Sequence, residues 1–392
     1  MSIIEIPVGP QHPALKEPIR FIFKIEGEVV VDVEPRLGYA HRGIEKLAET
    51  RTFIQNLYLA ERVCGICSAA HALCYVDVVE KLLGLEVPER ARYIRVIVTE
   101  LNRIQSHLLW LGVLMLEMGF DTMFMYVWRD RERVLDIIEL LCGNRVTYAM
   151  MTIGGVRYDI TDEMKPKILR MLKYVEDRTK YYIDIVNKDP LIRDRTMEVG
   201  ILPPREAREL CAVGPTIRGS KIPFDIRKTA PYEVYSELDF KVCVHDACDS
   251  YARTIVRLEE ILEACNIIRQ CLEKMPKGPI SKPTPRRYPP GEAMAQVEAP
   301  RGELMYYVKS DGKPKPYRLK IRTPTLANIP ALCAMLKGCY VADIPIIVAS
   351  IDPCIACMDR VMLVDENKGL IKIMAHEELR RYSLKWYERG RK

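Results

Sequence analysis

The stretches RVCGIC at residues 62–67 and DPCIACMDR at residues 352–360 decide how this chain is interpreted. Each contains one Cys-x-x-Cys pair: Cys64 with Cys67, and Cys354 with Cys357. One pair can hold a metal ion through two thiolates, so the two pairs together offer four sulfur ligands to one soft metal centre. Cys64 and Cys354 are 290 residues apart (354 − 64). Only a completed tertiary fold can bring pairs this distant together.

The spacing leaves several kinds of thiol site open. A structural zinc site uses the same four thiolates, but its pairs usually lie within a few tens of residues of each other. A thioredoxin-like redox site needs only one pair, at the start of a helix in a βαβ unit. A disulfide framework is not expected in a long chain that begins without a signal peptide. The spacing therefore favours a catalytic or redox metal over both structural zinc and thiols without a metal.

Length and composition indicate a globular chain. It has 392 residues, 48% of them hydrophobic and 29% charged, which predicts one large domain or two intimately packed ones. The net charge of +6 is spread along the sequence without a basic run, so we expect no nucleic-acid partner. The 13 cysteines predict a reducing, anaerobic compartment. No uninterrupted apolar stretch of about 20 residues is present, so membrane attachment is expected only through partner subunits.

Periodicity predicts a mainly α member of the α+β class, with a large helical body and small β-sheets formed by both chain ends. Four segments are expected: a β-rich segment at 1–42, a helical body at 43–275, an α/β segment at 276–360 that closes the metal site, and an extension at 361–392. The predicted helices span residues 68–83, 89–118, 129–150, 161–188, 236–275 and 329–336. The predicted strands span residues 20–25, 29–33, 303–308 and 317–321.

The residues around the cysteines resemble a known family. RVCGICSAAH at 62–71 and DPCIACMDR at 352–360 are similar to the N- and C-terminal signatures of nickel–iron hydrogenase large subunits. Other motifs look like the branch shared with the 49 kDa quinone-site subunit of complex I: GPQHP at 9–13, HRGIE at 41–45, ELNRIQSH at 100–107 and EAPRGEL at 298–304. The resemblance runs from about residue 5 to the C-terminus. It points to the energy-converting, membrane-associated hydrogenases and to their fold.

The resemblance implies reversible heterolytic cleavage of dihydrogen at a nickel–iron cluster whose iron carries CO and CN. Cys64 and Cys354 would be terminal nickel ligands, with Cys67 and Cys357 bridging nickel to iron. The alternative is a metal-free, complex I-like subunit that couples quinone or sulfur reduction. That lineage lacks the four thiols, and its quinone-binding Tyr would fall at or beside Gly65. The intact cysteine pairs favour the hydrogenase.

Further site residues follow from the same resemblance. Glu17 matches the carboxylate that gates proton exit, although by itself it would read as a solvated strand residue. His71, one turn after Cys67, would hydrogen-bond to a bridging sulfur or be a core histidine. Glu45 would serve a buried magnesium or further iron, or be a helix-surface residue. Arg301 and Arg322 would be cations near the diatomic ligands, or ion-pair partners.

Other polar residues are assigned with less specificity. His41 and His107 would lie in a coupling or proton-relay cavity, or simply in the core. The pair Cys243 and Cys248 is not expected to bind a second metal, because nothing nearby completes a ligand set. The remaining cysteines read as small buried hydrophobes.

The resemblance also implies partners and processing. The chain shows no cysteine spacing for an iron–sulfur wire of its own, so an iron–sulfur small subunit is implied, with ferredoxin-like and antiporter-like membrane subunits. The location implied is the cytoplasmic face of the membrane, peripheral and held by these partners. A maturation protease is expected to remove residues 361–392 after Arg360. The alternative is a permanent C-terminal helix that docks on a partner.

Overall fold

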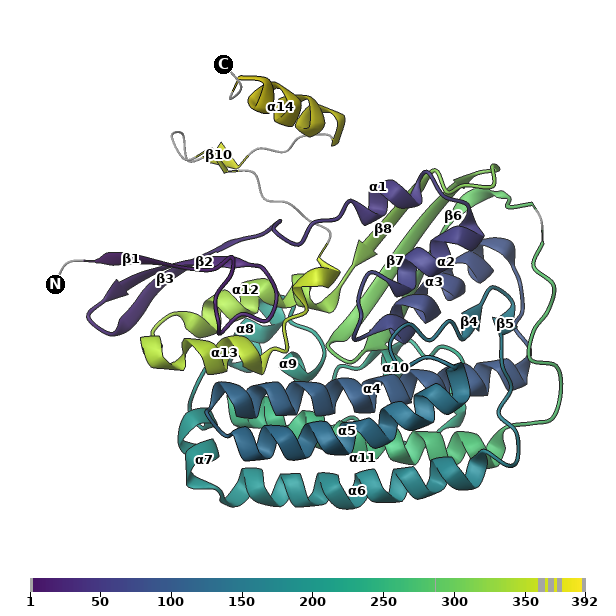
Figure 1. Cartoon of the computed structure of the whole chain (residues 1–392), viewed down its shortest axis with the longest axis horizontal. Helices are drawn as coiled ribbons and strands as arrows, with labels where there is room; N and C mark the ends of the chain where they lie inside the picture. Colours follow the sequence, from purple (N-terminus) through teal and green to yellow (C-terminus); the bar gives the residue numbers. More distant parts are fainter. Residues whose placement is uncertain (1–2, 286, 359–363, 366–369, 372–375, 390–392) are drawn as a thin grey trace.

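Long helices form the body of the computed structural model, which describes residues 3–285, 287–358, 364–365, 370–371 and 376–389. In Figure 1, α4 (Glu89–Glu117), α5 (Asp121–Cys142), α6 (Lys165–Lys188) and α11 (Ser250–Lys274) run along one another. α4 is buried on nearly every side, as the central helix of such a layer must be. A Cβ on Gly112 of α4 would lie 2.4 Å from the Trp128 ring, so this glycine lets α5 approach closely.

Two predicted helices differ most from the structure in their limits. α5 begins earlier than predicted and ends at Cys142, because Gly143 adopts a left-handed conformation (φ 71°) that closes the helix. α11 begins only at Ser250, where the Asp249 side chain accepts a hydrogen bond from the Ala252 amide. Residues 238–249, predicted as helix, are therefore irregular.

Two antiparallel three-stranded sheets flank the helical body. One contains β1 (Ile4–Val8), β2 (Arg20–Glu26) and β3 (Val29–Arg36), in that order. The other contains β6 (Pro290–Ala299), β7 (Gly302–Asp311) and β8 (Arg318–Arg322). α12 (Pro324–Leu336) covers β3, whereas α3 (Ser68–Leu83) packs against β6 and β7. The predicted class, mainly helical with small sheets from both chain ends, is confirmed.

Two hydrophobic cores meet at the second cysteine pair. The larger core joins the long helices to β6–β8 and includes Cys354 and Cys357. The smaller core joins the N-terminal sheet to α12 and α13 (Ile344–Ser350), and it includes Ile355. Because neighbouring residues of one loop belong to different cores, the packing of both chain ends determines where this loop lies.

The remaining elements are short. The helices are α1 (Ile44–Ala48), α2 (Phe53–Glu61), α7 (Pro190–Thr196), α8 (Pro204–Glu209), α9 (Pro215–Arg218), α10 (Ile226–Thr229), η1 (Tyr235–Glu237), η2 (Val341–Asp343), η3 (Ile355–Cys357) and α14 (His376–Arg389). The strands are β4 (Met151–Thr152), β5 (Gly155–Val156), β9 (Val364–Asp365) and β10 (Leu370–Ile371). The predicted cleavage position, Arg360, lies outside the described residues. Among the described helices, none combines the length and apolar character needed to cross a bilayer.

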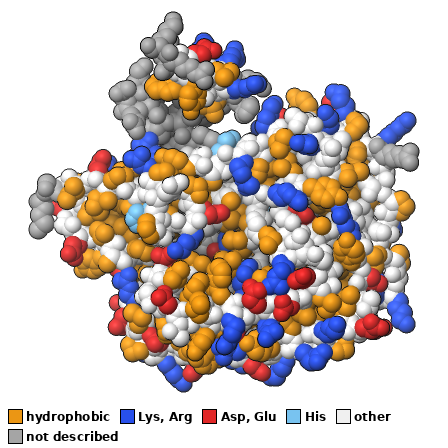
Figure 2. Space-filling view, viewed as in Figure 1, with side chains coloured by type: hydrophobic (Ala, Val, Ile, Leu, Met, Phe, Trp, Pro, Cys, Tyr) orange, Lys and Arg blue, Asp and Glu red, His pale blue; other side chains and the backbone are white. Residues whose placement is uncertain are grey.

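Charges of both signs share the molecular surface. On the face seen in Figure 2, Lys and Arg side chains are interspersed with Asp and Glu rather than gathered in one basic patch. Such a surface gives no single-sign field over this face.

Candidate metal centre

The tertiary fold brings the two cysteine pairs together. Cys64 and Cys67 lie between α2 and α3, while Cys354 and Cys357 lie just after α13, and all four are buried. The Cys64 and Cys354 sulfur atoms are 3.3 Å apart, those of Cys354 and Cys357 3.0 Å apart, and those of Cys67 and Cys357 3.8 Å apart. All four are free thiols. Four sulfurs in such mutual contact form one ligand set rather than two separate pairs.

Backbone and side-chain groups set the course of both cysteine loops. The Cys64 sulfur accepts hydrogen bonds from the amides of Ile66 (3.3 Å) and Cys67 (3.2 Å). In the second loop, the Cys354 amide donates to the Thr325 hydroxyl at 3.1 Å. Asp352, two residues earlier, has a positive φ of 56°, an uncommon backbone conformation for a residue with a side chain. Both loops are thus built to turn the sulfurs inward.

The sulfurs cannot all carry charge without a cation. Cys354, Cys357 and Cys64 surround Cys67 and hold the pKa of its thiol well below the usual value. The contact with Cys354 raises the pKa of the Cys357 thiol well above it. One thiolate is therefore stabilised at the expense of its neighbours. A soft metal ion would stabilise all four thiolates, so this buried donor set fits the centre predicted from the sequence.

His71 lies beside the sulfurs, on the first turn of α3. One of its ring nitrogens is within 4.8 Å of the Cys67 and Cys357 sulfurs. Its Nδ1 is 2.8 Å from the Tyr306 hydroxyl, and its buried Nε2 has no hydrogen-bond partner among the described residues. The ring is thus held from one side, with its other nitrogen available to a sulfur or a ligand of the centre.

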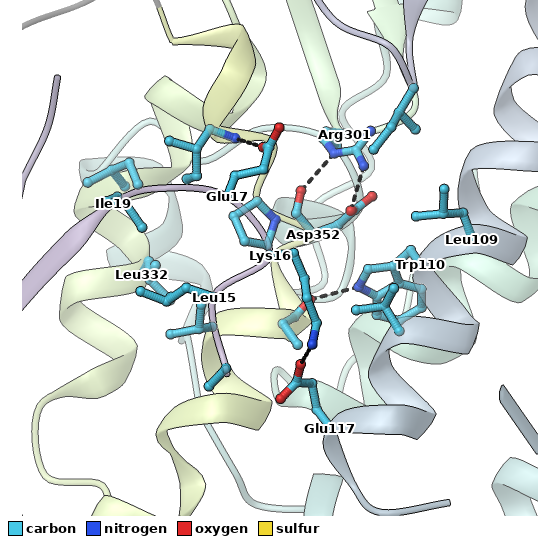
Figure 3. Close-up of a pocket in the computed structure, with 18 of the residues that line it drawn as sticks. Leu15, Lys16, Glu17, Ile19, Leu109, Trp110, Glu117, Arg301, Leu332 and Asp352 are labelled. Atoms are coloured by element: carbon cyan, nitrogen blue, oxygen red, sulfur yellow. Dashed lines mark hydrogen bonds and ion pairs between the residues drawn. The ribbon is translucent and has the colours of Figure 1, made fainter. Parts of the chain in front are cut away.

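Arg301 and Asp352 form a buried ion pair next to the second cysteine loop (Figure 3). Arg301 Nη2 donates to Asp352 Oδ1 at 2.6 Å, and Nε donates to the Asp352 carbonyl at 2.7 Å. Burial opposes the charge of Arg301, but Asp352 and the Cys354 sulfur raise its pKa well above the usual value. Arg301 is therefore a permanent cation beside the four cysteines.

Glu17 reaches the second cysteine loop from the connection between β1 and β2, not from a strand. Its Oε2 accepts hydrogen bonds from the backbone amides of Ile355 and Ala356, the latter at 3.1 Å. These two residues lie between Cys354 and Cys357. A carboxylate from the N-terminal segment is thereby placed against the loop that carries two of the sulfurs.

Two other predicted site residues lie elsewhere. The Arg322 side chain on β8 is 43% exposed, and its nearest carboxylate oxygen, from Glu303, is 3.7 Å away. Glu45 accepts hydrogen bonds from Lys320 Nζ (2.8 Å) and the Ile321 amide (2.9 Å). A metal ion at Glu45 would have to displace Lys320. The metal role predicted for Glu45 stays a prediction. Neither residue belongs to a metal-ligand group among the described residues.

The predicted relay histidines lie in different surroundings. His107 is buried on α4, and its Nε2 is 3.0 Å from Glu260 Oε2. Burial lowers the pKa of His107 to about 4, so the ring is neutral at pH 7. His41 is half-buried just before α1. Cys243 and Cys248 belong to no metal-ligand group in the described part of the chain.

Sequence reasoning missed Arg42, which joins the two cysteine loops. Its Nη1 donates to the Arg62 carbonyl at 2.9 Å, and its Nη2 donates to the carbonyls of Val63 (2.6 Å) and Ala356 (2.8 Å). Its place in the HRGIE motif was a signal, but a motif does not reveal which distant carbonyls an exposed guanidinium reaches.

A largely apolar cavity of about 200 Å³ borders the two cysteine loops (Figure 3). Its wall includes Ile66 and Ile355 from the two cysteine loops, with Trp110 from α4. Lys16 and Glu117, also in the wall, form an ion pair of 2.5 Å. Arg301 and Asp352 also line the cavity. A small uncharged molecule is thus the kind of ligand that this cavity accommodates.

Comparison with known proteins gives the family. Residues 117–290 and 282–360 match the family model of the 49 kDa subunit of respiratory-chain NADH dehydrogenase, and residues 42–116 match that of nickel-dependent hydrogenases. The chain belongs to the 49 kDa subunit family. It is 44% identical over 361 residues to one subunit of the F(420)H(2) dehydrogenase of Methanosarcina mazei, covering 90% of this chain and 96% of that one. It is 43% identical to the carbon monoxide-induced hydrogenase of Rhodospirillum rubrum, covering 92% and 100%.

The solved structures include another 49 kDa-like relative. The chain is similar to one from the membrane-bound sulfane sulfur reductase, an archaeal respiratory membrane complex, with a TM-score of 0.87 and 35% identity. The match covers 91% of this chain and 98% of that one. The predicted family resemblance is confirmed. The nickel-dependent hydrogenase match and the buried cysteines together support a metal-binding oxidoreductase subunit.

Proposed function

We propose that the chain is the catalytic subunit of an energy-converting nickel–iron hydrogenase that is peripheral to the cytoplasmic face of a membrane. The observation that carries the proposal is the contact between the Cys64 and Cys354 sulfurs, 3.3 Å apart in space and 290 residues apart in sequence. A fold that only recognised partner subunits would have no need of four convergent, buried, free thiols. The apolar cavity beside the two cysteine loops suits dihydrogen, which is small and uncharged.

The residues divide into ligands and supporting groups. Cys64, Cys67, Cys354 and Cys357 would hold a nickel–iron cluster whose iron carries CO and CN. Such a centre, when bound, supplies the electron-rich site at which dihydrogen is converted into two protons and two electrons. Arg301 would hold a fixed positive charge toward that centre, while Asp352 keeps its guanidinium in place.

Proton and electron transfer need different groups. Glu17 would take a proton from the centre, because its carboxylate is held at the loop between Cys354 and Cys357. His71 would orient a sulfur through its ring nitrogen. The electrons would pass to an iron–sulfur small subunit, with ferredoxin-like and antiporter-like membrane subunits completing the complex.

A second function is favoured by specific relatives. The chain resembles one subunit of an F(420)H(2) dehydrogenase as closely in sequence and length as it resembles a hydrogenase, and it shares the fold of a chain of a sulfane sulfur reductase. A metal-free coupling subunit for quinone or sulfur reduction is therefore the alternative. The ionisation of the thiols separates the two functions, because four neighbouring thiolates require a cation whereas a metal-free site keeps protons on its sulfurs.

The deciding experiment is nickel and iron analysis of the purified complex, with infrared spectroscopy of the CO and CN stretching region. Stoichiometric nickel with those bands supports the hydrogenase. An active complex that lacks both would instead be a quinone- or sulfur-reducing relative. Mass spectrometry of the same sample tests processing, since an intact Lys392 with full nickel occupancy would contradict cleavage after Arg360.

A further inference from the structure

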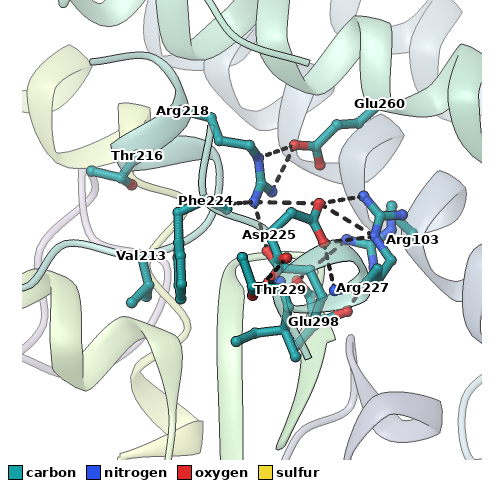
Figure 4. A network of polar contacts seen from close by, with 12 residues as sticks. Arg103, Val213, Thr216, Arg218, Phe224, Asp225, Arg227, Thr229, Glu260 and Glu298 are labelled. Carbon is teal, nitrogen blue, oxygen red and sulfur yellow. Dashed lines mark hydrogen bonds and ion pairs between the residues drawn. The ribbon is translucent and has the colours of Figure 1, made fainter. Parts of the chain in front are cut away.

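A row of buried charged residues links α4, α9, α10, α11 and β6. Figure 4 shows its centre, where Arg218 contacts Glu260 and Glu298, at 2.7 and 2.8 Å. Four arginines in and beside this row are in direct ion-pair contact with carboxylates. They are Arg103 with Glu100, Arg218 with Glu260 and Glu298, Arg227 with Asp225, and Arg301 with Asp352. Paired charges of this kind are the form in which buried arginines are normally tolerated.

Arg253 and Arg257 do not follow this pattern. They lie one turn apart on α11 and are 0% and 1% exposed, yet neither has a carboxylate oxygen within 4.0 Å in the described structure. Arg253 still donates to the Gly200 carbonyl (2.7 Å) and to the Ser350 hydroxyl (3.0 Å). Within the described part of the chain, Arg257 donates only to the Arg253 carbonyl, at 2.9 Å.

The unpaired nitrogen atoms of Arg257 are those that usually donate hydrogen bonds to a carboxylate. Its Nε and Nη2 are buried without a hydrogen-bond partner among the described residues, and together they form the bidentate edge of the guanidinium. Its flat face lies 4.4 Å from the centre of the Trp110 ring. Trp110 is itself held by a hydrogen bond to the Ala349 carbonyl (2.7 Å) and forms part of the cavity wall. Arg257 is therefore fixed in place but not neutralised.

Asp352 connects Arg257 to the cysteine site. Its carboxylate is the strongest attractive charge that acts on Arg257, but only Arg301 is in direct contact with it. The second oxygen, Asp352 Oδ2, is buried without a partner among the described residues. The Asp352 carboxylate is thus the counter-charge of two guanidinium groups, those of Arg301 and Arg257. Burial lowers the pKa of Arg257 only to about 10, so both arginines are charged at pH 7.

The local charges leave a positive surplus. Six guanidiniums (Arg103, Arg218, Arg227, Arg253, Arg257 and Arg301) share this interior with six carboxylates (Glu100, Asp225, Asp249, Glu260, Glu298 and Asp352). One of these, Glu298, has its pKa raised by burial to about 7, so it is only partly ionised. A buried surplus of positive charge is destabilising unless a negative group lies nearby.

We propose that Arg257 is a positioning residue that supplies counter-charge, through Asp352 and Arg301, to a negatively charged metal centre on the four cysteines. This inference rests on the proposed function. Arg301 and Asp352 neutralise each other, so this ion pair cannot balance the negative charge of four thiolates. In a water-excluded interior, a fixed cation acts over a longer distance than it does in water. Arg257 is therefore unfavourable to the metal-free chain and favourable to the loaded one.

The opposite signs of these two effects give the test. In full-length chain from cells grown without nickel, Arg257→Met should raise the thermal unfolding temperature, because an apolar side chain replaces a buried charge against Trp110. In the loaded complex the same change should lower nickel retention and make the centre harder to reduce. We expect about a tenfold change in its oxidised-to-reduced ratio at fixed potential, or roughly 59 mV for one electron. Arg257→Lys, which keeps the charge, should remain near the wild-type potential.

A structural role would give a different pattern. If Arg257→Met lowered the unfolding temperature of the metal-free chain, or prevented its folding, the proposal would be wrong. Arg218→Met is the matched control, because it leaves Glu260 and Glu298 without their cation and should lower that temperature. A loaded Arg257→Met complex with unchanged potential overturns only this inference. A wild-type complex without nickel or the infrared bands overturns the proposed function as well.

Discussion

Arg42 donates a hydrogen bond to the carbonyl of Ala356, a residue of the second cysteine loop 314 positions later in the sequence, at 2.8 Å. The same guanidinium holds the carbonyls of Arg62 and Val63. Because the side chain is exposed, it has little part in the hydrophobic core. Its contribution is to the relative position of the two loops that carry the sulfurs.

Arg42→Ala should therefore loosen the metal site while leaving the fold intact. Removing an outer group that orients metal ligands typically costs about 10–100-fold in metal affinity or activity. We expect nickel occupancy to fall on dialysis against a chelator, with an unchanged circular dichroism spectrum. Arg62→Ala is the control, since Arg62 is also exposed and lies beside the same loop, but its side chain donates to the Tyr58 carbonyl. Equal nickel loss in both variants would contradict a bridging role.

Cys357→Ser should abolish stoichiometric nickel binding. Its sulfur contacts those of both Cys354 and Cys67, so its loss opens the ligand set at the centre. Elemental analysis of the purified complex measures the effect. Cys74→Ser serves as the comparison, because Cys74 is also buried but its sulfur faces the carbonyls of Ala295 and Leu304. Nickel content that survives in Cys357→Ser would rule out the four-thiolate site.

Glu17→Gln should separate proton transfer from metal binding. A glutamine oxygen can still accept hydrogen bonds from the amides of Ile355 and Ala356, so the second cysteine loop should keep its position. It cannot carry a proton, and general acid–base groups contribute roughly 10²–10⁴-fold to rate. We expect full nickel occupancy with at least about a hundredfold loss of hydrogen oxidation. Glu117→Gln, in the same cavity, should lose far less.

His107 should make the free energy of unfolding depend on pH. Its pKa is about 4 in the folded chain because burial disfavours the charged ring, against an ordinary value of 6.5. As the pH falls, His107 therefore takes up its proton in the unfolded chain before it does so in the folded chain. Its contribution to the free energy of unfolding is complete above pH 6.5 and is lost as the pH falls toward 4. The difference corresponds to about 3 kcal/mol.

Urea unfolding between pH 7 and pH 4 checks this expectation. His107→Gln should be less sensitive to acid over that interval than the wild type. His12→Gln provides the reference, because His12 is exposed. The same acid sensitivity in wild type and His107→Gln would mean that another buried group is responsible.

Local sequence was sufficient for most of the secondary structure. The helix at residues 68–83 was predicted with the limits of α3, and the strands around Phe23 and Tyr306 were placed correctly. Periodicity and turn residues act over a few positions, so they can be read without the fold. Where a helix end depended on a single capping residue, as at Gly143 and Asp249, the predicted helix ran past that residue.

The sequence by itself determined the chemistry available to this protein: two Cys-x-x-Cys pairs, and the family to which their surroundings belong. Only the tertiary structure decided which residues meet. It placed Glu17 at the second loop, paired Arg301 with Asp352, left Arg322 half-exposed and engaged Glu45 with Lys320. The physical reason is that such contacts depend on how two hydrophobic cores pack both chain ends around one loop. This packing cannot be inferred from the spacing of residues in the sequence.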